Sequence, residues 1–191
     1  MKILGIFAIE FAQNTPMIAA FVVSYWLFLK RNWLGVVIII AGALGSAVLI
    51  ACTDAIKLSF TSLESAPFQW GRMFKSILLL TGAFCGFAFI IVGYLYWNRK
   101  HWWVDPVIGV AAGVGLTLLQ VSWHPGLPVR QIVGHMLAFA LAGTTVPLVT
   151  RIAGNLSVRR ESWRPLLVGC LVNNIVMSIF VVALEYLQFV N

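Results

Sequence analysis

Residues 3–29 read ILGIFAIEFAQNTPMIAAFVVSYWLFL, a run that is long enough to cross a bilayer and apolar at most positions. Glu10, Gln13 and Asn14 interrupt this run, and their spacing places all three on one face of a helix. Polar and ionisable side chains inside a membrane are costly unless they face the interior of a bundle or a wet cavity. The sequence therefore predicts that this face of the first span points inward and carries a candidate site.

The composition of the chain is typical of membrane proteins. Of its 191 residues, 61% are hydrophobic and 10% are charged, whereas soluble domains carry about 25% charged residues. A spanning helix takes about 20 residues, so the chain has room for about six spans and no separate soluble catalytic domain. We expect an all-α, polytopic bundle of about six transmembrane helices that forms a single domain over residues 1–191. The expected spans are residues 3–29, 33–53, 74–97, 107–123, 131–150 and 166–189.

Basic residues and tryptophans mark the ends of these spans and predict their orientation. Eight of the 13 Lys and Arg residues fall on one predicted side of the membrane and five on the other. By the positive-inside rule this favours a non-cytoplasmic location for both termini, in a protein of the cell membrane. The longest connection, residues 55–71, is expected to lie on the membrane surface or to fold back over the bundle.

Two further spans carry polar residues, and two spans contain a proline. His135 in the fifth span, and Asn174 and Glu185 in the sixth, lie on faces with helical spacing. Pro16 and Pro147 remove a backbone donor from the first and fifth spans, and transporters coordinate substrates at such interruptions. The structural alternative is that the polar residues only join helices or reach headgroups, and that each proline is a plain kink.

The sequence carries few signatures of other functions. It contains no His-Glu-x-x-His, Gly-x-Ser-x-Gly, Walker A or aspartate-rich motif, and its three cysteines are widely separated. We therefore expect no metal and no cofactor, and the sequence favours a protein that is not an enzyme. The net charge is +7, and the Lys and Arg residues lie between the apolar runs rather than on one face of a helix. This distribution argues against nucleic-acid binding.

These patterns favour a small transporter, or a substrate-capturing transporter subunit, whose polar cavity opens outward between the first, fifth and sixth spans. In such a cavity a carboxylate binds a proton or cation, amides hydrogen-bond the ligand, and an imidazole senses protonation. The expected ligand-binding or proton-binding residues are Glu10, Gln13, Asn14, His135, Asn174 and Glu185.

Two alternatives remain open from the sequence. The first is an accessory or scaffolding subunit of a larger membrane complex, and the second is a lipid-active enzyme that uses Glu10, His135 or Arg130. The expected partners are membrane lipids, a small-molecule or ion substrate, and a membrane or cytoplasmic partner subunit. The basic loop expected at residues 151–164 is the candidate docking site for a cytoplasmic partner.

Overall fold

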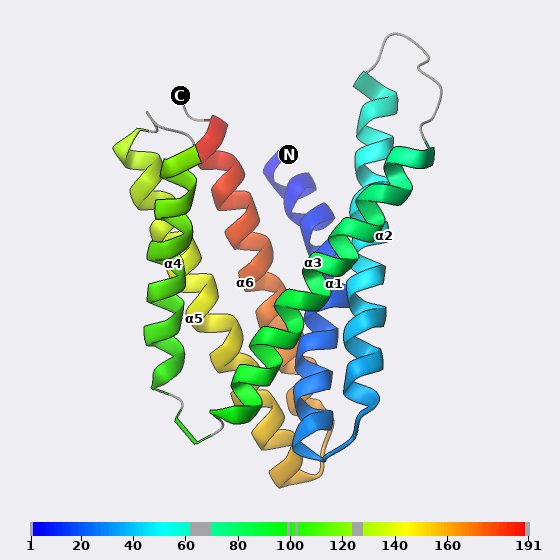
Figure 1. The fold of residues 1–191 in the computed structure, drawn as a ribbon, viewed down its shortest axis with the longest axis vertical. Coiled ribbons are helices and arrows are strands. Elements are labelled where there is room, and N and C mark those ends of the chain that lie inside the picture. The colour runs from blue at the N-terminus through cyan, green and yellow to red at the C-terminus, as the bar shows by residue number, and fades with distance from the viewer. Residues whose placement is uncertain (1, 62–69, 99, 102, 124–127, 190–191) are drawn as a thin grey trace.

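The structure, a computed structural model, describes residues 2–61, 70–98, 100–101, 103–123 and 128–189. These residues form six α-helices and no strand (Figure 1). The helices are α1 (Lys2–Leu29), α2 (Leu34–Thr61), α3 (Trp70–Trp97), α4 (Val104–Trp123), α5 (Val129–Arg160) and α6 (Arg164–Phe189). Among their described residues, α1, α2, α3, α5 and α6 each contain a stretch long and apolar enough to cross a membrane. The prediction of an all-α, polytopic membrane bundle is therefore confirmed.

The largest differences between the expected spans and the helices are at the ends of α2 and α5. Helix α2 continues to Thr61, so the first part of the connection expected at residues 55–71 is helical, and residues 62–69 lie outside the described part. Helix α5 continues to Arg160, past the end expected at residue 150. Arg151 therefore belongs to a helix and not to a loop. Arginine is a good helix former, so a charge that ends an apolar run does not end the helix.

Helix α1 is the centre of the bundle. It packs against α2, α3, α5 and α6, whereas the backbone of α4 comes close only to that of α5 within the described ranges. One face of α1 forms the main apolar core with α2 and α3. The buried members of this core are Met17, Phe21, Tyr25, Ile39, Ala43, Ala88, Val92 and Leu95. Of the polar side chains on α1, Gln13 and Ser24 are buried, whereas Glu10 and Asn14 are partly exposed.

The two ends of the bundle differ in what they carry. Both chain termini lie at one end, and the α1–α2, α3–α4 and α5–α6 connections lie at the other (Figure 1). We call the first the terminal end. We call the second the basic end, because Lys30, Arg31, Lys100, Arg159 and Arg160 lie there.

Candidate functional site

Two of the central helices contain a proline. Pro16 lies inside α1, and Pro147 lies inside α5. Proline has no N–H, so the carbonyl one turn before it loses its usual helical donor. In a membrane the polar groups freed in this way need partners from neighbouring helices, side chains or water.

Helix α2 packs closely against the Pro16 site. The Met17 N–H donates a hydrogen bond to Ser46 Oγ at 3.1 Å. A Cβ on Gly42 would lie 2.7 Å from the Pro16 carbonyl oxygen, and one on Gly45 would lie 3.1 Å from the Pro16 Cβ. Glycine at position 42 therefore allows α2 to approach near enough for Ser46 to reach the α1 backbone.

Consecutive asparagines of α6 join the two proline-containing helices. Asn174 Nδ2 donates to the Phe11 carbonyl at 3.0 Å and to Thr15 Oγ1 at 2.6 Å, both on α1. Asn173 Nδ2 donates to Thr150 Oγ1 on α5 at 2.9 Å. Thr15 precedes Pro16, and Thr150 lies within one turn of Pro147, so α6 bonds each helix beside its proline.

Several polar atoms in this region remain without a partner. Asn14 Nδ2, Asn173 Oδ1 and Asn174 Oδ1 are buried and make no hydrogen bond within the part of the chain that is described. Buried polar atoms are nearly always hydrogen-bonded, and exceptions often bind water, an ion or a ligand. We define the asparagine layer as Asn14, Thr15, Thr150, Asn173 and Asn174. It offers one amide donor and two amide acceptors in the interior of the bundle.

The other predicted residues lie outside this layer. Gln13 is buried on α1 with 6% of its surface exposed, and Glu10 is half-buried nearer the terminal end. His135 on α5 is 2% exposed, and its Nδ1 has no hydrogen-bond partner among the described residues. It precedes Pro147 by 12 positions, which is about 18 Å along a helix. Glu185 belongs to α6, but its side chain lies outside the described residues.

The structure therefore brings some of the predicted residues together and separates others. Asn174 bonds Thr15, the residue after Asn14, beside Pro16, and Asn173 bonds Thr150 near Pro147. No hydrogen bond between described residues joins His135 to the layer. That these residues bind a ligand or a proton stays a prediction.

A second polar cluster lies near the basic end, where α3, α4 and α5 meet. Arg151 forms a two-pronged ion pair with Asp105, with Nη2–Oδ1 at 2.7 Å and Nε–Oδ2 at 2.8 Å. The Tyr94 hydroxyl donates to Asp105 Oδ1 at 2.9 Å, and Arg151 Nη1 donates to the Asn98 carbonyl at 2.5 Å. The side chains of Arg151 and Asp105 are 3% and 0% exposed. We call Tyr94, Asn98, Asp105 and Arg151 the ionic cluster.

The ionic cluster was not predicted from the sequence. Arg151 was expected in the basic loop at residues 151–164, and it lies 46 positions after Asp105. One signal in the sequence could have indicated the pair. Asp105 lies near the start of the fourth span and Arg151 near the end of the fifth, and these two ends lie on the same side of the membrane if the spans are antiparallel. Helices α4 and α5 do pack closely, because a Cβ on Gly109 would lie 2.6 Å from the Thr144 nitrogen.

No protein-family model matches this chain, and neither a curated protein nor a solved structure is significantly similar to it. The functional argument therefore rests on the residues described above. The asparagine layer consists of amides and hydroxyls, which are groups that hydrogen-bond a solute or coordinate a cation.

Proposed function

We propose that this protein is a small membrane transporter, or the substrate-binding subunit of one, whose substrate site is the asparagine layer. The observation that supports this proposal is the group of three unpartnered amide atoms beside Pro16 and Pro147. Transporters place their sites near mid-membrane, where interrupted helices expose backbone carbonyls next to polar side chains. The layer lies where α1, α5 and α6 pack together, which are the spans expected to line the cavity.

The chemistry of the layer favours a small polar solute or a monovalent cation. Its five side chains are amides and hydroxyls, which carry no charge. A multivalent ion needs carboxylate ligands to offset its lost hydration, and the layer provides none. A solute with both donors and acceptors, or a cation held by amide and carbonyl oxygens, matches the groups present.

The proposed direction of access follows from charge. With the basic end in the cytoplasm, the terminal end faces outward, and a solute arriving from outside reaches the layer from that end. Glu10 and Gln13 lie on α1 between the terminal end and Asn14. In this proposal Glu10 takes up a proton or cation on the way in, and His135 responds to its protonation.

The test is a thermal-shift screen of the purified protein against amino acids, vitamins, sugars and alkali cations, with an Asn14→Leu variant in parallel. Leucine has a similar shape and removes an amide atom that has no partner, so the stability of the unliganded protein should hold or rise. Binding of a hit should weaken about tenfold, the effect of one lost hydrogen bond to a bound solute.

A matched control is Thr81→Val on α3, whose hydroxyl bonds only within its own helix, to the Ile77 carbonyl. This variant should bind the solute as the wild type does. Silence of the wild type toward every solute, together with higher stability of Asn14→Leu, would mean that the layer only packs helices.

The second candidate, an accessory subunit of a larger complex, is favoured by one observation on α3. Gly82 and Gly86 are one turn apart, and a Cβ on either would meet nothing within 4 Å. Small residues at this spacing often allow another transmembrane helix to approach. Stable co-purification with a defined membrane protein, without any solute-dependent stabilisation, would favour this candidate over transport.

A further inference from the structure

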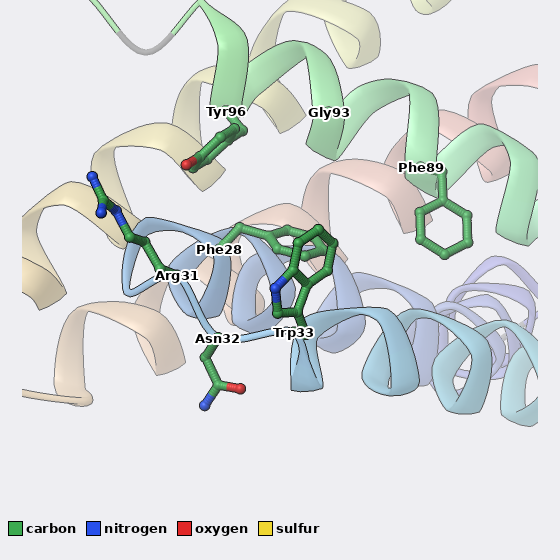
Figure 2. Close-up of a pocket in the computed structure, with 7 residues that line it drawn as sticks. All are labelled: Phe28, Arg31, Asn32, Trp33, Phe89, Gly93 and Tyr96. Atoms are coloured by element: carbon green, nitrogen blue, oxygen red, sulfur yellow. The ribbon is translucent and has the colours of Figure 1, made fainter.

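A cavity of about 460 Å³ lies at the basic end, between the α1–α2 connection and the last turns of α3 (Figure 2). Its size falls within the range of small-ligand sites. Four aromatic residues, one glycine and two polar residues line it: Phe28, Trp33, Phe89, Tyr96, Gly93, Arg31 and Asn32.

The aromatic side chains line the walls of the cavity, and the Gly93 backbone lies at its base, which we call the floor. The Phe28 ring packs edge-on against Trp33 at 6.4 Å and against Tyr96 at 6.5 Å, so the three rings make one wall. Figure 2 shows Tyr96 and Phe89 extending from α3 on either side of Gly93. A Cβ on Gly93 would meet nothing within 4 Å, so the space beside its backbone is empty of protein.

The cavity opens outward and not into the bundle. Trp33 is 79% exposed, and Phe89 and Tyr96 are also exposed. In a membrane such a surface is covered by lipid or by another protein. Exposed tryptophans at the same end, Trp97 and Trp103, place this level at the interface between headgroups and acyl chains.

The charge at the rim is positive. Arg31 lines the cavity and is exposed, and Lys30 beside it lies 4.4 Å from the centroid of the Trp26 ring. No described carboxylate forms an ion pair with either of these cations. A guanidinium presents paired donors that match phosphate oxygens, so the rim is complementary to a phosphate group.

We propose that this cavity binds one anionic phospholipid, with the headgroup phosphate on Arg31 and an acyl chain against Gly93, between Phe89 and the Phe28–Trp33 wall. The phosphate is the part that the exposed cation recognises, and the apolar slot beside it runs toward the membrane interior along α3. Phe89 lies one turn deeper on that helix than Gly93, as an acyl chain entering from the headgroup level requires.

The test is native mass spectrometry of the purified full chain titrated with phosphatidylglycerol and, separately, phosphatidylcholine. The wild type should hold one phosphatidylglycerol more tightly than one phosphatidylcholine. Gly93→Leu fills the floor of the cavity and should weaken binding of both lipids about tenfold. Gly115→Leu is the control, because this residue lies on α4, away from the cavity, and its Cβ also meets nothing within 4 Å. It should bind both lipids as the wild type does.

A second variant tests the phosphate contact. Arg31 has a φ of 55°, a left-handed conformation that asparagine tolerates, so Arg31→Asn removes the charge without adding backbone strain. Its preference for phosphatidylglycerol over phosphatidylcholine should disappear while acyl-chain binding remains.

Three results would overturn the proposal. The first is wild-type lipid retention by Gly93→Leu, and the second is an unchanged headgroup preference in Arg31→Asn. The third is a wild-type dimer that Gly93→Leu dissociates, because the cavity would then be an interface between two copies of this chain.

Discussion

The asparagine layer and the ionic cluster are both polar and shared by three helices, but they differ in how fully their buried atoms are partnered. In the ionic cluster, both carboxylate oxygens of Asp105 accept hydrogen bonds and three nitrogens of Arg151 donate them. In the asparagine layer, three amide atoms make no hydrogen bond within the described part.

From this difference we expect a structural role for the ionic cluster and a binding role for the asparagine layer. A buried ion pair whose donors and acceptors are all engaged has nothing left to offer a ligand, and removing one partner leaves an uncompensated charge. A buried amide with an unpartnered donor or acceptor can hydrogen-bond a ligand. Without a ligand, the unpartnered atom lowers the stability of the protein. We therefore expect changes in the ionic cluster to reduce stability and changes in the asparagine layer to reduce binding.

The largest expected effect is that of Arg151→Met, which leaves the Asp105 carboxylate buried without its cation. The free energy of unfolding should fall by about 3–5 kcal/mol, measured by denaturant titration in mild detergent. The double variant Asp105→Leu with Arg151→Met should recover most of this loss, because it removes both charges. Arg159→Met, an exposed arginine of the same helix, is the control and should change little. A double variant as unstable as the single one would contradict the role of the pair.

A smaller loss is expected when α4 is pushed away from α5. A Cβ on Gly113 would lie 2.7 Å from the Ala140 nitrogen, so Gly113→Val should cost about 1–3 kcal/mol by overpacking. Gly115→Val is the matched control on the same helix, since its Cβ would meet nothing within 4 Å. Because α4 carries Asp105 but no residue of the asparagine layer, solute binding by Gly113→Val should match the wild type. Lost binding at unchanged stability would contradict the separation of the two clusters.

The smallest effect is expected at Ser46, which accepts the Met17 N–H beside Pro16. Ser46→Ala leaves that buried donor without its acceptor and should cost about 1 kcal/mol, within the range for hydrogen bonds between membrane helices. Thr53→Ala on the same helix is the control, since its hydroxyl bonds only to the Leu49 carbonyl one turn before it. The unfolding temperatures of the two variants are compared. Equal unfolding temperatures would contradict a stabilising hydrogen bond from Met17 to Ser46.

The sequence predicted the part of this architecture that follows from local periodicity. The spacing of Gln13 and Asn14 indicated an inward face on the first span, and Gln13 is buried. The helical class and the number of helices followed from the apolar runs. These features depend on residues within a few turns of one another, so they can be predicted from a single sequence.

The rest depends on how distant helices meet. The end of α5 was placed at the first charge, but the Arg151 side chain is buried by Asp105, and this pairing compensates its charge inside the protein. The cavity beside Gly93 depends on the distance between α3 and the α1–α2 connection, which the residue types do not encode locally. Asn173 reaches α5 while Asn174, the next residue, reaches α1, and the helix that each amide meets is not encoded by its neighbours in the chain.

The central position of α1 has a consequence for synthesis. This helix leaves the ribosome before the other five, yet its Thr15 is bonded to Asn174, a residue 159 positions later in the chain. At about 5–20 residues per second, roughly 10–30 s pass between the two. During that interval the polar face of α1 lacks its α6 partner, and lipid supplies no substitute. We therefore expect the insertion machinery to keep the polar face of α1 away from lipid until α6 is inserted.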